Sequence, residues 1–205
     1  MSPRARPEDG PEVPGFLELP PGKIAAVATY LEMRRPPAEA KSAPPSGAFV
    51  RLSGDVVRYR RLFGEVGRPW LWFSRASLSD AQLETIIDDP AVEALAFVID
   101  GADAGILELD FRKAADECEL AFLGLVPGAV GRGLGRELAA EGIRRAFSRP
   151  ISRLWLHTCT LDHPGAVRFY RSVGFLPYRR ALEVADDPRL TGRLPRSAAP
   201  DVPII

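Results

Sequence analysis

Residues 125–138 read LVPGAVGRGLGREL, in which Gly131, Gly133 and Gly135 occupy every second position. An apolar run typical of a strand precedes these glycines, and a helix-like run follows them. A glycine inside a helix costs up to about 1 kcal/mol relative to alanine, so three glycines where a helix begins need a reason. The first N–H groups of a helix have no acceptor within the helix and lie at the positive end of its dipole, so they stabilise an anion. The stretch therefore predicts a phosphate or pyrophosphate held by backbone N–H groups, with Gly131 free to take a positive φ.

Two common phosphate loops do not fit these residues. A P-loop needs glycine, four residues and then Gly-Lys-Ser/Thr, a string that the sequence lacks. A dinucleotide fingerprint counted from Gly131 would place Arg136 at its third glycine, and the next predicted strand ends in His157, Thr158 and Cys159 instead of an acid. Nicotinamide and flavin cofactors are therefore disfavoured. His157 and Cys159 alone do not make a zinc site, so no metal is predicted.

Composition narrows the class of protein. Hydrophobic residues make up 46% of the 205 residues and charged residues 26%, which is ordinary for a globular protein with a real core. Lys+Arg and Asp+Glu both number 27, so no basic excess favours nucleic acid as a partner. No apolar run is long enough for a membrane helix, and the N-terminus lacks the apolar core of a signal peptide. Two cysteines, Cys118 and Cys159, fit a reducing cytoplasm better than a disulfide scaffold.

Proline marks the expected boundaries of the compact body. Ten of the 20 prolines lie in residues 1–45 and four lie after residue 187, and proline lacks the N–H group that helices and sheets use. Residues 22–33 are apolar enough for one strand, and 36–46 read as a linker. The division that follows is a flexible arm over 1–15, an N-terminal extension over 16–47, a body over 48–182 and a tail over 183–205.

The body alternates the patterns of strands and helices. Helices are expected over 55–67, 78–89, 133–149 and 163–175, with Ser79 as a plausible N-cap. Strands are expected over 48–53, 92–100, 104–112, 118–126, 152–160 and 175–184. Hairpins followed by strand–helix–strand–helix–strand predict an α/β fold with a mixed sheet.

Two motifs in this order resemble those of the GNAT acetyltransferase superfamily. VPGAVGRGLG (126–135) is similar to its acetyl-CoA loop, Gln/Arg-x-x-Gly-x-Gly/Ala, with Val130 where the family has Gln or Arg. HPGAVRFYRSVGF (163–175) resembles Asn-x-x-Ala-x-x-x-Tyr-x-x-x-Gly-Phe, with His163 in place of Asn. The resemblance covers roughly residues 48–182 and looks like a bacterial branch of the superfamily.

The resemblance implies a sheet splayed into a V around acetyl-CoA and direct transfer of the acetyl group to an amine. The pantetheine arm is expected to pair with the strand near Leu123 and Leu125. The residues that the resemblance assigns to acetyl-CoA are Leu123, Leu125, Val126, Val130, Gly131, Arg132, Gly133, Leu134, Gly135, Arg136, His163, Ala166 and Tyr170.

Two residues are predicted to move protons. By its match to the family motif, Tyr170 is the general acid that protonates the departing thiolate. Glu119, eleven residues before Val130, matches the position of the catalytic glutamate in some members of the superfamily. Strict alternation along the strand places Glu119, Leu123 and Leu125 on one face, and a carboxylate that ends an apolar face would have a raised pKa suited to a base.

Other residues and other functions stay open. Trp70, Trp72 and Phe73 either border the acceptor site or belong to the core. Glu108 and Asp110 alternate with apolar residues, as in a half-buried strand. A carboxylate that faced the cleft could hold a cationic acceptor, but a solvated strand face is favoured. The predicted function is an N-acetyltransferase acting on a primary amine, of a small molecule or a protein, with a homodimer left open. Its rivals are an acyl-CoA-binding sensor without chemistry and a subunit that acts by protein–protein contact through its Pro-rich arms.

Overall fold

A computed structural model describes residues 15–37 and 45–205, so residues 1–14 of the predicted arm 1–15 and residues 38–44 of the predicted linker 36–46 lie outside the described residues. The strands are β1 (Lys23–Met33), β2 (Ala48–Arg51), β3 (Val92–Ile99), β4 (Ala102–Asp110), β5 (Glu117–Leu125), β6 (Arg153–Cys159) and β7 (Leu176–Asp186). The helices are α1 (Val56–Gly67), α2 (Asp80–Ile87), α3 (Leu134–Phe147) and α4 (Ala166–Ser172), with short 3-10 turns at Arg68–Trp70 and Pro127–Ala129.

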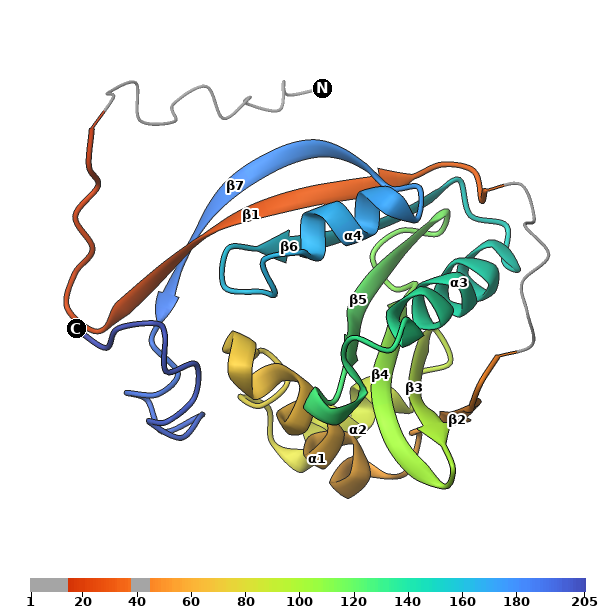
Figure 1. The fold of residues 1–205 in the computed structure, drawn as a ribbon, viewed down its shortest axis with the longest axis horizontal. Coiled ribbons are helices and arrows are strands. Elements are labelled where there is room, and N and C mark those ends of the chain that lie inside the picture. Colours follow the sequence, from red (N-terminus) through yellow and green to blue (C-terminus); the bar gives the residue numbers. More distant parts are fainter. Residues whose placement is uncertain (1–14, 38–44) are drawn as a thin grey trace, which may run out of the picture.

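All these strands join one mixed sheet in the order β2-β3-β4-β5-β6-β1-β7, which confirms the predicted α/β class. Strands β2 to β5 form an antiparallel meander, and β5 pairs with β6 in parallel. Figure 1 shows the two halves of the sheet diverging, with β2–β5 below and β6, β1 and β7 above. The sheet is therefore continuous in its strand order but open in its middle.

Strand β1 lies inside the sheet, between β6 and β7. It pairs antiparallel with both neighbours, from Ala28 opposite Cys159 on one side and from Lys23 opposite Asp186 on the other. Its alternate residues are buried, as expected for a strand with one covered face. The sheet thus extends beyond the expected body of 48–182 at both of its ends, and the division of the chain into domains stays a prediction.

The two helices between β2 and β3 begin at side-chain caps. Asp55 accepts a hydrogen bond from the backbone N–H of Arg58 at the start of α1. Ser79 caps α2 as predicted, in a capping box with Gln82. Such caps satisfy N–H groups that a helix leaves without partners. They fix where each helix starts, and the Ser79 cap also marks the end of the connection from α1 to α2.

Helices cover both faces of the sheet. Buried residues of α1 and α2, among them Tyr59 and Leu83, pack on one face of β3 and β4. On the other face, Ile143 and Ala146 of α3 pack on β4, β5 and β6, in a cluster that also contains Leu31 of β1. Figure 1 shows α1 and α2 grouped at the lower end of the molecule and α3 beside β5. Within the described residues, no helix is long and apolar enough to span a membrane.

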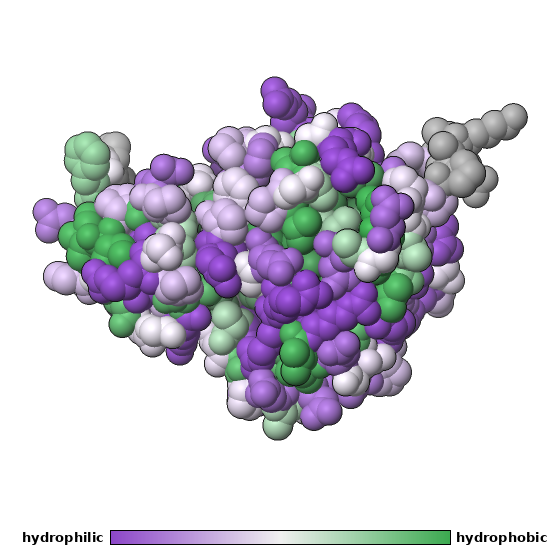
Figure 2. Space-filling model, turned by 60° about the horizontal axis from the view of Figure 1, so that its bottom comes forward, coloured by the Kyte–Doolittle hydropathy of each residue, from purple (hydrophilic) through white to green (hydrophobic). Residues whose placement is uncertain are grey.

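The C-terminal residues fold back on the start of β1. Leu194, Ala198 and Ala199 pack with Ile24 and Leu71 in a separate cluster. Figure 2 shows hydrophobic surface gathered at the left of the view, on the side where Figure 1 places the start of β1 and the C-terminus. The residues after β7 are thus packed on the fold, against the strand that occupies the centre of its C-terminal half.

Replacing Leu31 by alanine tests whether β1 is integral to the core. The Leu31 side chain is fully buried, so its truncation is expected to lower the free energy of unfolding by about 3 kcal/mol. Val27→Ala on the same strand is the matched control, because Val27 is 42% exposed. Urea denaturation of both variants measures the difference, and equal small losses would show that β1 contributes little to the core.

Candidate active site

The site begins where β5 and β6 part. The two strands pair only from Glu117 opposite Arg153 to Glu119 opposite Trp155. Beyond that point, within the described residues, β5 pairs only with β4, and β6 pairs only with β1, up to Cys159. The edges of β5 and β6 that face each other therefore have no strand between them. A cavity of about 900 Å³ runs through this opening and is lined by residues of both halves. The predicted V is therefore present, with Glu119 at its apex.

A β-bulge changes which residues of β5 share a face. Glu108 lies opposite Phe122, whereas its neighbour Leu109 lies opposite Leu120, so Ala121 is an extra residue on β5. The predicted common face of Glu119, Leu123 and Leu125 is therefore wrong, because strict alternation fails across a bulge. Residues opposite one another in an antiparallel pair share a face, which puts Glu119 on the α1 side with Phe122.

Leu123 and Leu125 lie on the other face of β5. Both pack with Leu134 and Leu138 of α3, the helix that follows the glycine loop. The bulge thus directs the carboxylate of Glu119 to one side of the sheet and the two leucines to the other. Their backbone groups, on the open edge of β5, are placed to meet a chain lying in the gap.

The glycine loop takes the backbone shape that its sequence predicts. Gly131 and Gly133 have φ angles of +83° and +80°, and a Cβ at either position would meet no atom within 4 Å. The positive φ favours glycine, because other residues would be strained there, and the open space beside both glycines leaves the loop backbone accessible. In the described part of the chain, the N–H groups of Gly131, Arg132 and Gly133 have no hydrogen-bond acceptor. The loop therefore presents a row of free donors at the N-terminus of α3.

Gly135 has a different role from the other two glycines. A Cβ on Gly135 would lie 3.5 Å from the ring of Phe169, an ordinary van der Waals contact, so α3 and α4 approach one another closely at this glycine. Arg136, one residue later, donates to Ser172 of α4 at 3.3 Å. The first turn of α3 is thus joined to α4 beside the cavity, which brings the two predicted motifs together.

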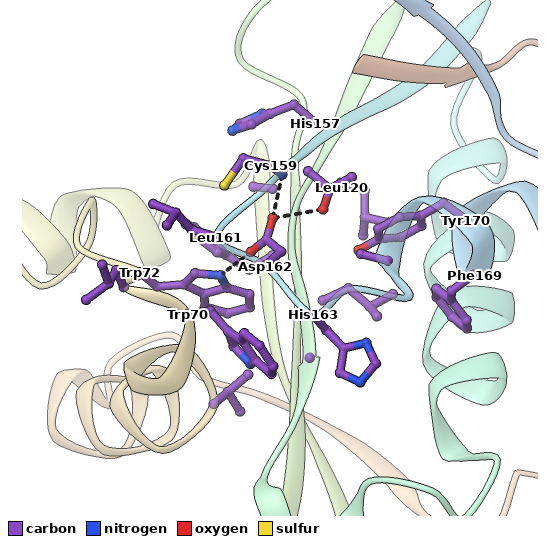
Figure 3. Close-up of a pocket in the computed structure, with 18 of the residues that line it drawn as sticks. Trp70, Trp72, Leu120, His157, Cys159, Leu161, Asp162, His163, Phe169 and Tyr170 are labelled. Atoms are coloured by element: carbon purple, nitrogen blue, oxygen red, sulfur yellow. Dashed lines mark hydrogen bonds between the residues drawn. The ribbon is translucent and has the colours of Figure 1, made fainter. Parts of the chain in front are cut away.

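Helix α4 carries Tyr170 and begins next to His163. Figure 3 shows the Tyr170 ring pointing into the cavity from the side of α4. Burial raises the pKa of the Tyr170 hydroxyl, and the negative charge of Asp162 raises it further. His163 accepts a hydrogen bond from the N–H of Gly165 at 3.0 Å and packs edge-on against Trp70. At this position the imidazole therefore caps the turn that leads into α4.

Glu119 is buried at the apex in contact with two cations or potential cations. Its Oε2 lies 2.7 Å from Lys113 Nζ, and its Oε1 lies 3.5 Å from His157 Nδ1. Burial alone would raise the pKa of Glu119, but hydrogen bonds and charges from His157 and Lys113 outweigh it, and the pKa lies below its usual value. The predicted raised pKa is wrong, because the sequence did not reveal that Lys113 faces this carboxylate.

Asp162 links the two halves of the opening and was not among the predicted site residues. Its Oδ2 accepts hydrogen bonds from Thr158 Oγ1 at 2.8 Å and from the N–H of Cys159 at 2.7 Å. Its Oδ1 accepts from Trp72 Nε1 at 3.0 Å, across from the α1–α2 connection. Figure 3 shows this bridge beside the cavity. An aspartate just after a strand, near His163 and a proline, was the only signal available in the sequence.

A buried polar network lies behind the cavity wall. Glu108 is fully buried, accepts a hydrogen bond from Tyr59 and pairs with Arg75 at 2.6 Å. Asp110 is also buried and pairs with Arg112 at 2.6 Å. The predicted solvated face is therefore wrong for both carboxylates, because α1 and the connection after it cover that face of β4.

Most of the residues predicted to bind the cofactor or to act in catalysis line this one cavity. They are Glu119, Leu123, Leu125, Val130, Gly135, Arg136, His163, Ala166 and Tyr170. Val126, Gly131, Arg132, Gly133 and Leu134 lie beside it along the same loop and are not part of its lining. Trp70, Trp72 and Phe73 also line the cavity, although Trp72 packs on Phe63 and Phe122 as a core residue would.

The comparisons with known proteins identify the family. Residues 60–175, more than half of the chain, match the Acetyltransferase (GNAT) family. The chain therefore belongs to the GNAT acetyltransferase family, as its two motifs predicted. A mycothiol acetyltransferase of Tsukamurella paurometabola is 28% identical over 177 residues, which are 79% of this chain and 60% of that protein. The chain thus spans less than two thirds of the length of this curated relative.

Solved structures agree on the fold. A GNAT-family acetyltransferase structure from Novosphingobium aromaticivorans has a TM-score of 0.58 at 21% identity, covering 82% of this chain and 68% of that one. A GCN5-related N-acetyltransferase from Kribbella flavida has a TM-score of 0.55 at 19% identity, covering 83% of this chain and 63% of that one. At these identities the likeness concerns the fold, and the roles of single residues must be argued from their own geometry.

The lowered pKa of Glu119 predicts how its contribution to stability depends on pH. A carboxylate with a lowered folded-state pKa stabilises the protein above its unfolded pKa of about 4.3, and this contribution is lost as pH falls through the folded pKa. Glu119→Gln is therefore expected to lower the melting temperature at pH 7 and to match the native protein near the acid end of the folded range. Thermal melts between pH 3 and pH 8 measure the difference, and a deficit that does not change with pH would contradict it.

Proposed function

We propose that the protein transfers the acetyl group of acetyl-CoA directly to a primary amine. The observation that carries the proposal is the open edge of β5, which ends in a loop of free backbone N–H groups and faces Tyr170 across one cavity. Acetyl-CoA, a thioester with a long polar arm and a pyrophosphate, matches the order in which these features occur along the cavity. The arm has an unpaired strand edge beside it, and the pyrophosphate has donors at a helix N-terminus.

The cofactor end is positively charged, in keeping with an anionic donor. Arg132, Arg136 and Arg168 are exposed around the glycine loop and α4, and none of them pairs with a carboxylate among the described residues. Guanidinium groups bind phosphate oxygens in a planar, two-pronged geometry. When bound, acetyl-CoA would supply an activated acyl group, and these arginines with the loop N–H groups would hold its phosphates.

Tyr170 is proposed to protonate the sulfur that leaves. The hydroxyl is protonated at neutral pH, as an acid must be, and burial raises its pKa, which makes Tyr170 a weaker acid than an ordinary tyrosine. The hydroxyl points into the cavity and has no hydrogen-bond partner among the described residues. Its proton is thus available to a group lying in the gap between β5 and β6.

Glu119 is proposed to accept the proton of the amine, together with His157. The lowered pKa makes Glu119 ionised at neutral pH but also a weaker base than a carboxylate with a raised pKa. His157 Nδ1 lies 3.5 Å from this carboxylate, and the half-exposed ring lines the cavity. Figure 3 shows His157 near the top of the view and Tyr170 at its right, and both side chains line the cavity.

The alternative function, a non-catalytic acyl-CoA sensor, predicts that the protein binds acetyl-CoA but acetylates no amine. The family membership and the pair of Tyr170 and Glu119 at one cavity favour an enzyme. A cytoplasmic location and a homodimer remain part of the proposal. Turnover of a panel of amines, read as release of free thiol, separates the enzyme from the sensor.

Gly135→Glu tests the cofactor site. The new side chain would place bulk and negative charge at the first turn of α3, against the ring of Phe169. Acetyl-CoA is expected to raise the melting temperature of the native protein, because it binds only the folded state, and to have little effect on the variant. Desulfo-CoA should act like acetyl-CoA, since the phosphate contacts do not involve sulfur. A folded Gly135→Glu protein with an unchanged shift would disprove the loop assignment.

Tyr170→Phe tests the acid. The variant keeps the ring and its contacts with Phe169 and Phe175 but removes the hydroxyl. We expect kcat to fall by about 100-fold or more, the range of general acid catalysis, while the thermal shift with acetyl-CoA is retained. Steady-state kinetics with one good acceptor provide the measurement, and a native kcat would remove Tyr170 from the mechanism.

A further inference from the structure

The two ends of the cavity carry opposite charge. The lining from α3 and α4 carries Arg136 and Arg168 and is called the positive end, whereas the lining from the β6–α4 loop and β7 carries the carboxylates of Asp162 and Glu183 and is called the negative end. Neither of these carboxylates forms a salt bridge among the described residues, and Asp162 is held only by neutral donors. A bound ligand that spans the cavity therefore meets a positive field at one end and a negative field at the other.

The positive side chain at the negative end is already neutralised. Arg75 lines the cavity, but its guanidinium donates to Glu108 at 2.6 Å and lies over the ring of Phe122. Lys113 likewise pairs with Glu119 at 2.7 Å. Within the described residues, no uncompensated cation lies among the side chains of this end to receive an acidic group.

The walls of the same end are apolar. Leu71, Phe73 and Leu161 belong to one hydrophobic cluster with Ile24 and Ala185, and all of these residues line the cavity. Figure 3 shows Leu161 beside Trp72, next to Asp162. Apolar walls with a few convergent polar groups are typical of a pocket that takes an organic body and fixes one end of it.

We propose that the acceptor is a cationic amine with an apolar body and no carboxylate next to the amine, an aralkylamine rather than an amino acid. This inference rests on the proposed acetyl transfer and names its acceptor class. The ammonium approaches along Asp162 and Glu183, loses its proton near Glu119 and His157, and its nitrogen attacks the acetyl carbonyl. The C–S bond then breaks, and the sulfur takes a proton. An amino acid would bring its carboxylate into the same negative field.

Matched pairs that differ only by a carboxylate test the proposal. Tyramine is compared with tyrosine, and tryptamine with tryptophan, using the native chain, acetyl-CoA and release of free thiol. We expect kcat/KM to favour the amine without the carboxylate on the order of 100-fold, as two like charges about 6 Å apart at an effective dielectric constant of about 20 predict. Equal or faster acetylation of the amino acids would overturn the proposal.

Variants that remove one charge test whether Asp162 and Glu183 cause the preference for amines without a carboxylate. Glu183→Gln and Asp162→Asn are each expected to reduce the preference by about tenfold, because each removes one negative charge from this end. Asp186→Asn is the matched control, since Asp186 lies three residues after Glu183 on β7, is not part of the cavity lining and pairs with Lys23. Glu183 is exposed, so its variant is expected to fold even if loss of the Asp162 bridge destabilises the protein.

Two further outcomes separate this inference from the proposed function. A preference that neither Glu183→Gln nor Asp162→Asn changes would refute the role of these carboxylates. If acetyl-CoA raises the melting temperature but no amine of either series releases thiol, while other primary amines do, the aralkylamine class is wrong and acetyl transfer stands. If no primary amine at all releases thiol, acetyl transfer itself fails.

Discussion

The parallel pairing of β5 with β6 over only three residue pairs is the constraint on which the rest of the site depends. Glu117–Glu119 hold the two halves of the sheet together, and everything beyond Glu119 is separated. An unpaired strand edge that is exposed to solvent favours aggregation, because its free N–H and C=O groups can pair with the strands of other chains. Here both edges face a cavity, and α3 and α4 meet at Gly135 and Phe169 on one side of it.

Several features of the fold and the site could be predicted from short sequence motifs. The glycines at 131 and 133 predicted a loop with positive φ and free donors, since few other sequences tolerate that backbone. Ser79 was correctly predicted as the N-cap of α2, because a capping box involves only residues three positions apart in the sequence. Tyr170 lay in a motif whose helix reaches the cavity. Such features depend on neighbours in sequence, which is why the sequence alone carried them.

Features that depend on distant residues were missed. The segment 22–33 read as a strand, but nothing local placed it between β6 and β7, more than 120 residues away. The bulge at Ala121 broke an alternation that the apolar pattern did not interrupt. The pKa of Glu119 depended on Lys113 and His157, which come from a loop and another strand. In each case a tertiary contact overrode an expectation that was reasonable for the isolated segment.

The position of β1 has a consequence for the order in which the fold assembles. Residues 23–33 leave the ribosome well before residues 153–186, yet among the described residues β1 pairs only with β6 and β7. Until β6 and β7 are synthesised, the backbone groups of the apolar β1 segment have no strand to pair with. The strands β2–β5, in contrast, pair with partners that are close in sequence. Folding through such long-range closure is slow and leaves edges open to aggregation. The first half-sheet is therefore expected to form during synthesis, and the cavity only once the chain is nearly released.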